Sequence, residues 1–233
     1  MNITYYGHSC FKIISNSLVI ITDPFDKSVG LVPPRLGADI ITVSHDHYDH
    51  NNTQAISGSP FIINGPGEYE IKGISIKGIL SFHDNCQGQE RGLNTIYLIE
   101  TEGIKLCHLG DFGQDKLIDT QFEAINNPDI LFIPVGGKYT IDAASASSLI
   151  SQVEPKIVLP MHYKISGLKI DLPPTFSSLG KKGREVSNQK VGGLAPLDKF
   201  LKEMGIAKKE PIDKLTIKKK DLPQETEVMV MKV

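Results

Sequence analysis

The chain has 233 residues, of which 40% are hydrophobic; this is enough for one substantial core and favours a single domain over two. The 25 basic residues nearly balance the 27 acidic ones, so the net charge of −2 excludes an overall attraction to nucleic acid or to an anionic membrane. The apolar runs at 18–21 and 130–135 are far shorter than the roughly 20 residues that cross a bilayer, and 1–6 has no signal-peptide pattern. We therefore expect a cytoplasmic protein with no membrane partner.

Segments rich in β-branched and apolar residues recur through the first two thirds of the chain, separated by turn residues. They predict strands at 3–6, 10–14, 18–22, 40–44, 61–64, 69–71, 74–80, 94–100 and 104–108. Helices are predicted at 119–126 and 143–152, and each is followed by an apolar run, at 130–135 and at 157–160. A long mobile loop at 163–193, a helix at 196–204 and a strand at 227–232 come after them. This order favours an α/β fold in which helices face stacked sheets, in one domain spanning 1–233.

The most informative segment is 45–50, where three histidines and two aspartates fall within six positions. A strand that ends just before it would direct His45 and His47 the same way, and the following turn could return Asp49 and His50 to the same pocket. Imidazole nitrogen and carboxylate oxygen are the atoms that borderline divalent metals prefer. The segment therefore predicts a site for two metal ions, whereas a polar loop with surface histidines would not explain such a density.

Two ions need more donors than one segment supplies, and three further candidates follow predicted strands. They are His83, Asp111 and His162, each just beyond an apolar run. Strand ends can deliver loop side chains to a common rim, so we expect these residues to join the cluster.

These motifs resemble the metallo-β-lactamase superfamily of metal-dependent hydrolases. The resemblance rests on HxHxDH at 45–50, a later histidine, HLGD at 108–111 and PMHY at 160–163. Further segments are similar to the small branch related to the ascorbate-6-phosphate lactonases, and they are YGHSCF at 6–11, TDPF at 22–25, GPGEY at 65–69 and PVGG at 134–137. The resemblance covers residue 1 to about residue 164.

The resemblance implies a four-layer αββα sandwich of two mixed β-sheets with a binuclear site at one edge. One ion would be held by His45, His47 and a third histidine, and the other by Asp49, His50 and His162, with Asp111 bridging the two. The third histidine departs from the commonest pattern, since Asp84 follows His83 and no glycine–histidine pair precedes the next strand. We take His83 as the ligand, with His108 as the alternative.

Three more residues are expected to stand behind the ligands and orient them. His8 and Asp23 lie at strand ends in the motifs of the resemblance, and His108 precedes Asp111 closely enough to orient it by hydrogen bonding. A carboxylate that accepts the second N–H of a ligand histidine fixes its tautomer. A purely structural role is the alternative for the first two, with His8 in a turn and Asp23 capping the turn at Pro24.

Two ions about 3.5–4 Å apart can lower the pKa of a shared water from about 15.7 to about 7 and polarise a carbonyl or phosphoryl oxygen. Asp49 is the candidate catalytic residue, because it could both bind an ion and orient the resulting hydroxide. The sequence thus predicts a hydrolase of a small anionic ester, lactone or phosphoester with two divalent ions, of which zinc is favoured and manganese or iron are alternatives.

Two other functions stay open at this point. A nuclease of the same superfamily would usually bring a strongly basic surface, and a metal-bound sensor or scaffold would show no turnover. The charge balance makes nucleic acid an unexpected partner, whereas a homo-oligomer is compatible with the sequence.

Overall fold

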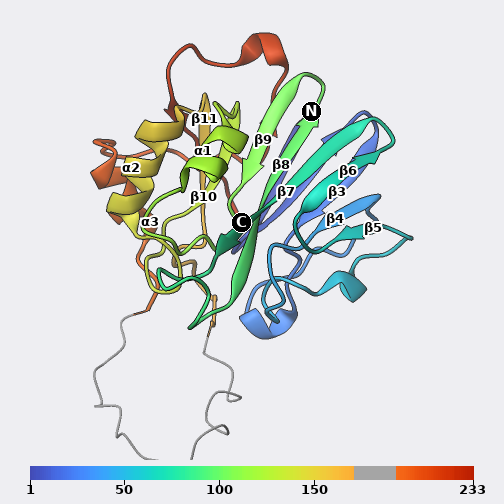
Figure 1. Ribbon diagram of the computed structural model, residues 1–233, viewed down its shortest axis with the longest axis horizontal. Coiled ribbons are helices and arrows are strands. Elements are labelled where there is room, and N and C mark those ends of the chain that lie inside the picture. The colour runs from blue at the N-terminus through green and yellow to red at the C-terminus, as the bar shows by residue number, and fades with distance from the viewer. Residues whose placement is uncertain (171–192) are drawn as a thin grey trace, which may run out of the picture.

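The computed structural model describes residues 1–170 and 193–233, so most of the loop expected at 163–193 lies outside the described residues. The strands form two mixed sheets that pack against each other, with α-helices beside one of them (Figure 1). This arrangement confirms the predicted α/β sandwich of two mixed β-sheets. The C-terminal part of the chain contributes a short strand to each sheet.

The first sheet has six strands. In spatial order they are β12 (Leu215–Thr216), β1 (Asn2–Gly7), β2 (Cys10–Ser15), β3 (Leu18–Thr22), β4 (Ile40–Thr42) and β5 (Phe61–Ile63). Short turns join β1, β2 and β3, which pair antiparallel, whereas β3, β4 and β5 pair in parallel. Buried side chains alternate with partly buried ones along β1, as expected for a strand with one face on the core.

The second sheet has seven strands. In spatial order they are β13 (Glu227–Val228), β11 (Ile157–Met161), β10 (Ile130–Pro134), β9 (Ile104–His108), β8 (Leu93–Thr101), β7 (Ile74–Phe82) and β6 (Gly67–Ile71). β10 and β11 are buried along their whole length, which is typical of parallel strands covered on both faces. The last strand is shorter than the predicted 227–232, because beyond Val228 only Met231 forms a further bridge, to Ile212.

The main hydrophobic core lies between the two sheets. Phe11 of β2 and Phe132 of β10 meet across it with ring centroids 4.6 Å apart, and Tyr5 stacks on Phe11 at the same distance. Both phenylalanines are completely buried. Aromatic pairs of this kind stabilise the packing beyond the free energy of burying their surface.

The α-helices cover the outer face of the seven-stranded sheet (Figure 1). They are α1 (Asp119–Ile125), α2 (Ala143–Val153) and α3 (Leu197–Glu203), and they lie beside β9, β10 and β11. α2 begins where the carboxylate of Asp142 accepts a hydrogen bond from the Ser145 N–H, and its buried stripe includes Leu149 and Val153. No helix among the described residues has the length and apolar character that crossing a bilayer requires.

Loops cover the outer face of the six-stranded sheet. The expected four-layer αββα arrangement places α-helices on this face. Neighbouring residues of β3 and β4 point to opposite faces, and Ile21 and Ile41 accordingly belong to a second, smaller cluster together with Phe25 and Val29. Among the described residues the segments over this cluster carry only the short 3-10 helices η1 (Lys27–Val29) and η2 (Thr53–Ala55). Phe25 and Val29 are fully buried, so these loops already shield the face from water.

The inter-sheet core predicts a large stability cost for truncating Phe132. We expect Phe132→Ala to lower the free energy of unfolding by about 3–5 kcal/mol, because it removes buried surface and leaves a cavity. Phe61→Ala is the matched control, since Phe61 lies on the edge strand β5 and is half exposed; it should change stability by less than about 0.5 kcal/mol. Urea unfolding followed by circular dichroism measures both values, and equal effects would contradict the assignment of the core.

Candidate metal centre

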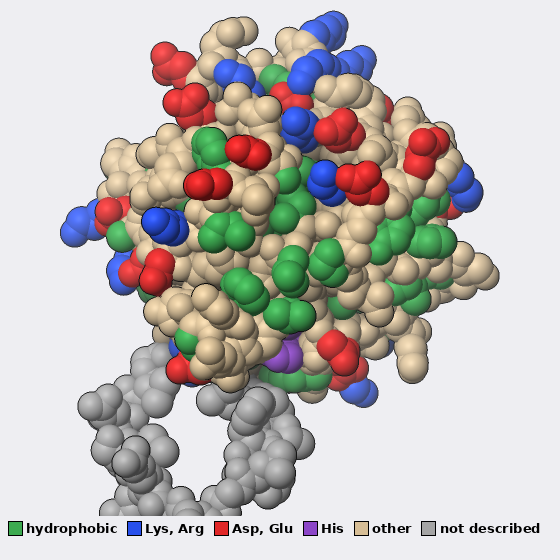
Figure 2. Space-filling model, viewed as in Figure 1, with side chains coloured by type: hydrophobic (Ala, Val, Ile, Leu, Met, Phe, Trp, Pro, Cys, Tyr) green, Lys and Arg blue, Asp and Glu red, His purple; other side chains and the backbone are tan. Residues whose placement is uncertain are grey.

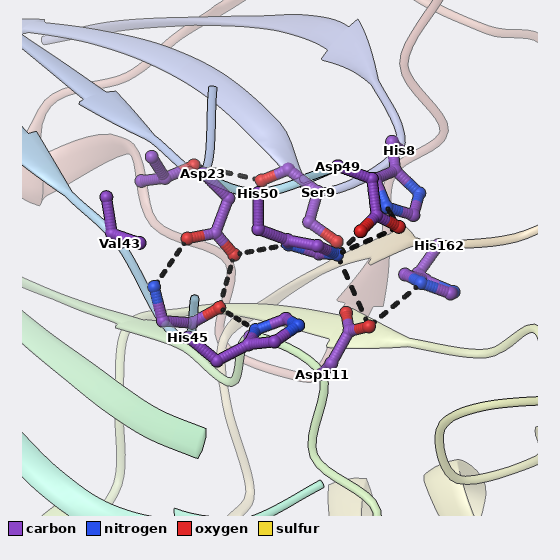
Figure 3. Close-up of polar contacts among 12 residues, drawn as sticks. His8, Ser9, Asp23, Val43, His45, Asp49, His50, Asp111 and His162 are labelled. Carbon is purple, nitrogen blue, oxygen red and sulfur yellow. Dashed lines mark hydrogen bonds and ion pairs between the residues drawn. The ribbon is translucent and has the colours of Figure 1, made fainter. Parts of the chain in front are cut away.

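Strand ends at one edge of the sandwich bring the predicted donors together (Figure 3). His8 lies in the β1–β2 turn, Asp23 follows β3, the 45–50 segment follows β4, His83 follows β7, Asp111 follows β9 and His162 follows β11. The donors therefore come from both sheets, and the packing of the sheets sets the distances between them.

The path of the chain after β4 differs from the prediction. β4 ends at Thr42, two residues before the predicted end, so strand alternation does not direct the histidines that follow. The chain turns instead, with the His50 N–H donating to the carbonyl of His47 at 2.9 Å. His45 and His47 still meet, with ring centroids 4.4 Å apart.

Asp111 occupies the centre of the cluster. Its Oδ2 lies 3.3 Å from Nε2 of His50, 3.3 Å from Nε2 of His83 and 3.1 Å from Nε2 of His162. The residue is only 2% exposed. One carboxylate thus contacts histidines from both of the predicted ion sites, as a bridging ligand must.

The first group of donors contains three histidines. The rings of His45 and His83 are 4.7 Å apart and those of His47 and His83 are 5.2 Å apart, and one nitrogen from each of the three lies within 4.8 Å of the others. His83 therefore lies together with His45 and His47, and His108 is not part of this group. Among the seven histidines, all of them in the described part of the chain, only His47 is not buried.

The second group surrounds His50. Its Nε2 lies 3.7 Å from Oδ2 of Asp49 and 2.9 Å from Nε2 of His8. The His8 Nε2 is also 3.1 Å from the Asp49 carboxylate, and the rings of His8 and His162 are 4.3 Å apart. His8 was expected to stand behind the ligands, yet its nitrogen faces the same space as theirs.

Asp23 and Ser44 orient two of these histidines. His50 donates its Nδ1–H to Oδ2 of Asp23 at 3.0 Å, so its Nε2 faces the cluster. The Ser44 hydroxyl donates to the same oxygen at 2.7 Å and lies 2.9 Å from Nδ1 of His45, so it can accept the proton of that nitrogen. Asp23 thus contacts His50 on the side away from the cluster, and its role in orienting a metal ligand stays a prediction.

Unpartnered atoms show that the residues fit metal ions. Nε2 of His45 and Oδ1 of Asp111 are buried, and neither has a hydrogen-bond partner in the described part of the chain. With its proton on Nδ1, His45 presents a bare lone pair, and a buried acceptor without a partner costs about 1–3 kcal/mol. Imidazole and carboxylate donors at these positions suit zinc, manganese or iron.

His108 supports the backbone next to Asp111 and does not join the donors. Its Nε2 lies 3.0 Å from the carbonyl of Ser9, and its Nδ1 accepts the N–H of Gly110 at 3.2 Å. The hydrogen bond to Asp111 that the sequence suggested comes from a different residue, Asn94, whose Oδ1 accepts the Asp111 N–H at 2.9 Å.

Asn94 is a site residue whose role sequence reasoning missed. It is completely buried, and its amide also donates to the carbonyl of Leu109 at 2.9 Å and to the hydroxyl of Ser81 at 2.7 Å. The sequence signal for this role was its position at the start of a predicted apolar strand, because a side-chain amide buried there needs hydrogen-bond partners. Asn94 holds the loop that carries Asp111.

The charges in the cluster shift several pKa values. Burial would raise the pKa of Asp111, but His162 and His50 outweigh it and hold this pKa well below its usual range. Burial would lower the pKa of His50, but Asp111 and Asp49 raise it well above the usual value. Burial lowers the pKa of His8 and of His83 to about 4, so both are neutral at pH 7, as metal ligands must be.

The lowered histidine pKa values predict that the metal-free protein is destabilised by acid. Between pH 6.5 and about 4 the unfolded chain binds protons that buried His8 and His83 do not, so the stability present above pH 6.5 declines as the pH falls. His50 acts in the opposite direction, because its raised pKa favours the folded state below pH 6.5 and this contribution declines as the pH rises through that pKa. The pKa values of His45 and His47 are also lowered, so we expect the acid destabilisation to exceed the opposite contribution of His50.

Thermal unfolding in chelator from pH 7.5 to pH 4.5 measures this effect, and the melting temperature should fall. The variant His83→Gln is the control, because it removes one of the groups and should give a shallower decline. An unchanged melting temperature across this range would contradict the prediction.

Comparison with known proteins identifies the family. Residues 2–162 match the model of the beta-lactamase superfamily domain. A UPF0173 metal-dependent hydrolase of Thermoplasma acidophilum is 31% identical over 204 residues, which is 77% of this chain and 90% of the relative. A similar hydrolase of Methanosphaera stadtmanae is 32% identical over 196 residues, which is 70% of this chain and 84% of the relative.

A solved structure from Thermotoga maritima is assigned to the zinc-dependent hydrolases of the metallo-β-lactamase superfamily. It is 35% identical, with a TM-score of 0.74, and the match covers 99% of this chain and 97% of that one. The chain therefore belongs to the beta-lactamase superfamily, within its UPF0173 group of metal-dependent hydrolases.

Proposed function

We propose that the protein is a binuclear metal-dependent hydrolase of a small anionic ester, lactone or phosphoester. The observation that carries the proposal is the carboxylate of Asp111, which lies within 3.3 Å of histidines from both groups of donors. Zinc is the favoured metal because imidazole donors prevail, and manganese or iron suit the same set. The relatives named metal-dependent hydrolases support this reaction class.

The donors divide into two sets around Asp111. The first ion would be held by His45, His47 and His83, the second by Asp49, His50 and His162, with Asp111 shared. When bound, such a pair of ions supplies a water of lowered pKa and Lewis-acid polarisation of the substrate. Ligand histidines must be neutral, so binding would displace the proton that His50 holds in the metal-free site.

Asp49 is the residue of this chain best placed to handle the proton of the attacking water. It is buried, and although burial would raise its pKa, His50 and His8 keep the pKa below its usual range, so the carboxylate is ionised at neutral pH. Its Oδ2 lies between the nitrogens of His8 and His50. An ionised carboxylate fixed in this way can bind an ion, orient a water and accept its hydrogen bond.

Charge and access support a small anionic substrate. The donor sets contain two carboxylates, Asp49 and Asp111, against four positive charges of two divalent ions, so the loaded centre attracts anions. Figure 2 shows a histidine side chain at the surface of this face, beside hydrophobic side chains. His47 is partly exposed, so solvent can reach the first set of donors. Segments of the sequence resemble the branch related to the ascorbate-6-phosphate lactonases, so phosphosugar lactones are among the substrates to be tested.

We expect Asp49→Asn to lower kcat by roughly 100-fold to 10,000-fold. The amide carries no negative charge to bind a metal ion, and it cannot accept a proton at neutral pH. The measurement is turnover of the metal-loaded protein across phosphodiesters, phosphosugar lactones and thioesters. Asp46→Asn is the matched control, since Asp46 belongs to the same motif but is exposed; its variant should keep wild-type turnover. If Asp49→Asn turns over as fast as the wild type, the assigned role is wrong.

Removal of metal gives an independent test of the centre. A chelator should abolish turnover, and added Zn²⁺ or Mn²⁺ should restore it. Elemental analysis of the loaded protein should find about two ions per chain, as a two-metal site requires. A saturated content of one ion per chain would exclude the binuclear centre, and a substrate turned over equally well in chelator would exclude the mechanism.

A further inference from the structure

We propose that His8 binds the second of the two ions directly, through its Nε2 atom, instead of standing behind the ligands. This inference rests on the binuclear centre proposed above and adds a donor to it. It concerns the β1–β2 turn, a part of the chain that lies far in sequence from the HxHxDH segment at 45–50.

The backbone of His8 is held firmly against the end of β11. Its carbonyl accepts hydrogen bonds from the Tyr5 hydroxyl and from the His162 N–H, both at 2.8 Å. The residue has a φ of +56°, in the left-handed region that is unfavourable for a residue with a side chain. The turn therefore fixes a completely buried imidazole beside His162.

The distances around Nε2 of His8 are short enough for its neighbours to share a cation with it. Two ligand atoms bound at about 2.1 Å lie about 3.0–3.4 Å apart when they subtend about 90–109° at the ion. Nε2 of His8 lies 2.9 Å from Nε2 of His50 and 3.1 Å from Oδ2 of Asp49. Nitrogens of His8, His50 and His162 also lie within 4.8 Å of one another.

The Nε2 atoms of His8 and His50 face each other. Asp23 accepts the Nδ1–H of His50 at 3.0 Å, so a neutral His50 carries its lone pair on Nε2, toward His8. The two Nε2 atoms lie 2.9 Å apart, and in the metal-free site one proton between them can join them as a hydrogen bond. A metal ion that displaces this proton would receive both lone pairs.

His8 shares its hydrogen-bond pattern with two of the proposed ligands, His83 and His162, and differs from the structural histidine His108. In His8, His83 and His162, Nε2 faces the cluster and the buried Nδ1 has no partner in the described part of the chain. His108 is equally buried, yet backbone groups partner both of its nitrogens. The second ion would then have one more protein donor than the first, which makes the two metal sites unequal.

The direct test counts the histidines bound to metal. The full-length protein is labelled with ¹⁵N-histidine and loaded with ¹¹³Cd²⁺ as the probe. One-bond coupling to cadmium should appear at six of the seven histidines, His108 being the exception. Coupling at only five histidines, with the signal of His8 uncoupled, would overturn the inference. The test needs no variant, so it does not depend on the folding of one.

Variants of His8 measure what this donor contributes. His8→Asn suits the left-handed backbone and lacks a donor at the Nε2 position, whereas His8→Gln can place an oxygen there. We expect His8→Asn to lower the affinity for one of the two ions by more than the roughly 10–100-fold that the loss of an orienting residue costs. The absorption spectrum of the Co²⁺-loaded protein should also change. His8→Gln should recover part of this loss.

Asp46→Asn is the matched control, since Asp46 belongs to the 45–50 segment but is exposed; it should keep both ions and the Co²⁺ spectrum. Two tightly held ions and an unchanged spectrum in both His8 variants would overturn the inference. The outcomes also separate this inference from the proposed function. Six coupled histidines without turnover of any substrate would contradict the hydrolase and leave His8 a ligand. Five coupled histidines together with turnover of a substrate would support the hydrolase and contradict the assignment of His8 as a ligand.

Discussion

The buried carboxylate of Asp111 is the group on which the geometry of the site depends. An ionised carboxylate taken out of water destabilises the fold unless positive charge and hydrogen bonds compensate it. Its Oδ2 contacts the histidines at 50, 83 and 162, which come from three separate parts of the chain, and its N–H is held by Asn94. In the metal-free site the raised pKa of His50 supplies the positive charge. Divalent ions would supply more of it, in agreement with the number of imidazoles around this carboxylate.

A second buried carboxylate, Asp23, connects the two halves of the centre. One of its oxygens receives hydrogen bonds from His50, which belongs to the second set of donors, and from Ser44, whose hydroxyl also contacts Nδ1 of His45 in the first set. Its other oxygen accepts the Ser44 N–H at 2.7 Å. A single side chain at the end of β3 thus sets the tautomers of one histidine in each set, so a displacement of β3 would misalign both ions together.

The sequence predicted the parts of the site that local spacing determines and missed those that the packing of the two sheets creates. Most of the strands and all three helices lie within two residues of their predicted bounds, and His83, not His108, lies beside His45 and His47. The early end of β4 was not predictable from alternation, because Val43 and Ser44 are as compatible with a strand as with the turn they enter. The burial of Asn94 and the approach of His8 to His50 depend on distant strands, which a one-dimensional pattern does not place.

Three residues of the centre have left-handed backbone conformations. His8, Asp23 and His162 have φ values of +56°, +41° and +53°, and each follows directly on a strand. Glycine would relieve the strain at each position, at about 1–2 kcal/mol apiece, but would remove a donor or its orienting carboxylate. Where no side chain is needed glycine does occur, as at Gly110, whose φ is +58° and where Ser44 and Asn94 leave no room for a Cβ atom. The chemistry at the edge therefore accounts for a side chain at these three positions, and His8 carries one in the same way as His162 does.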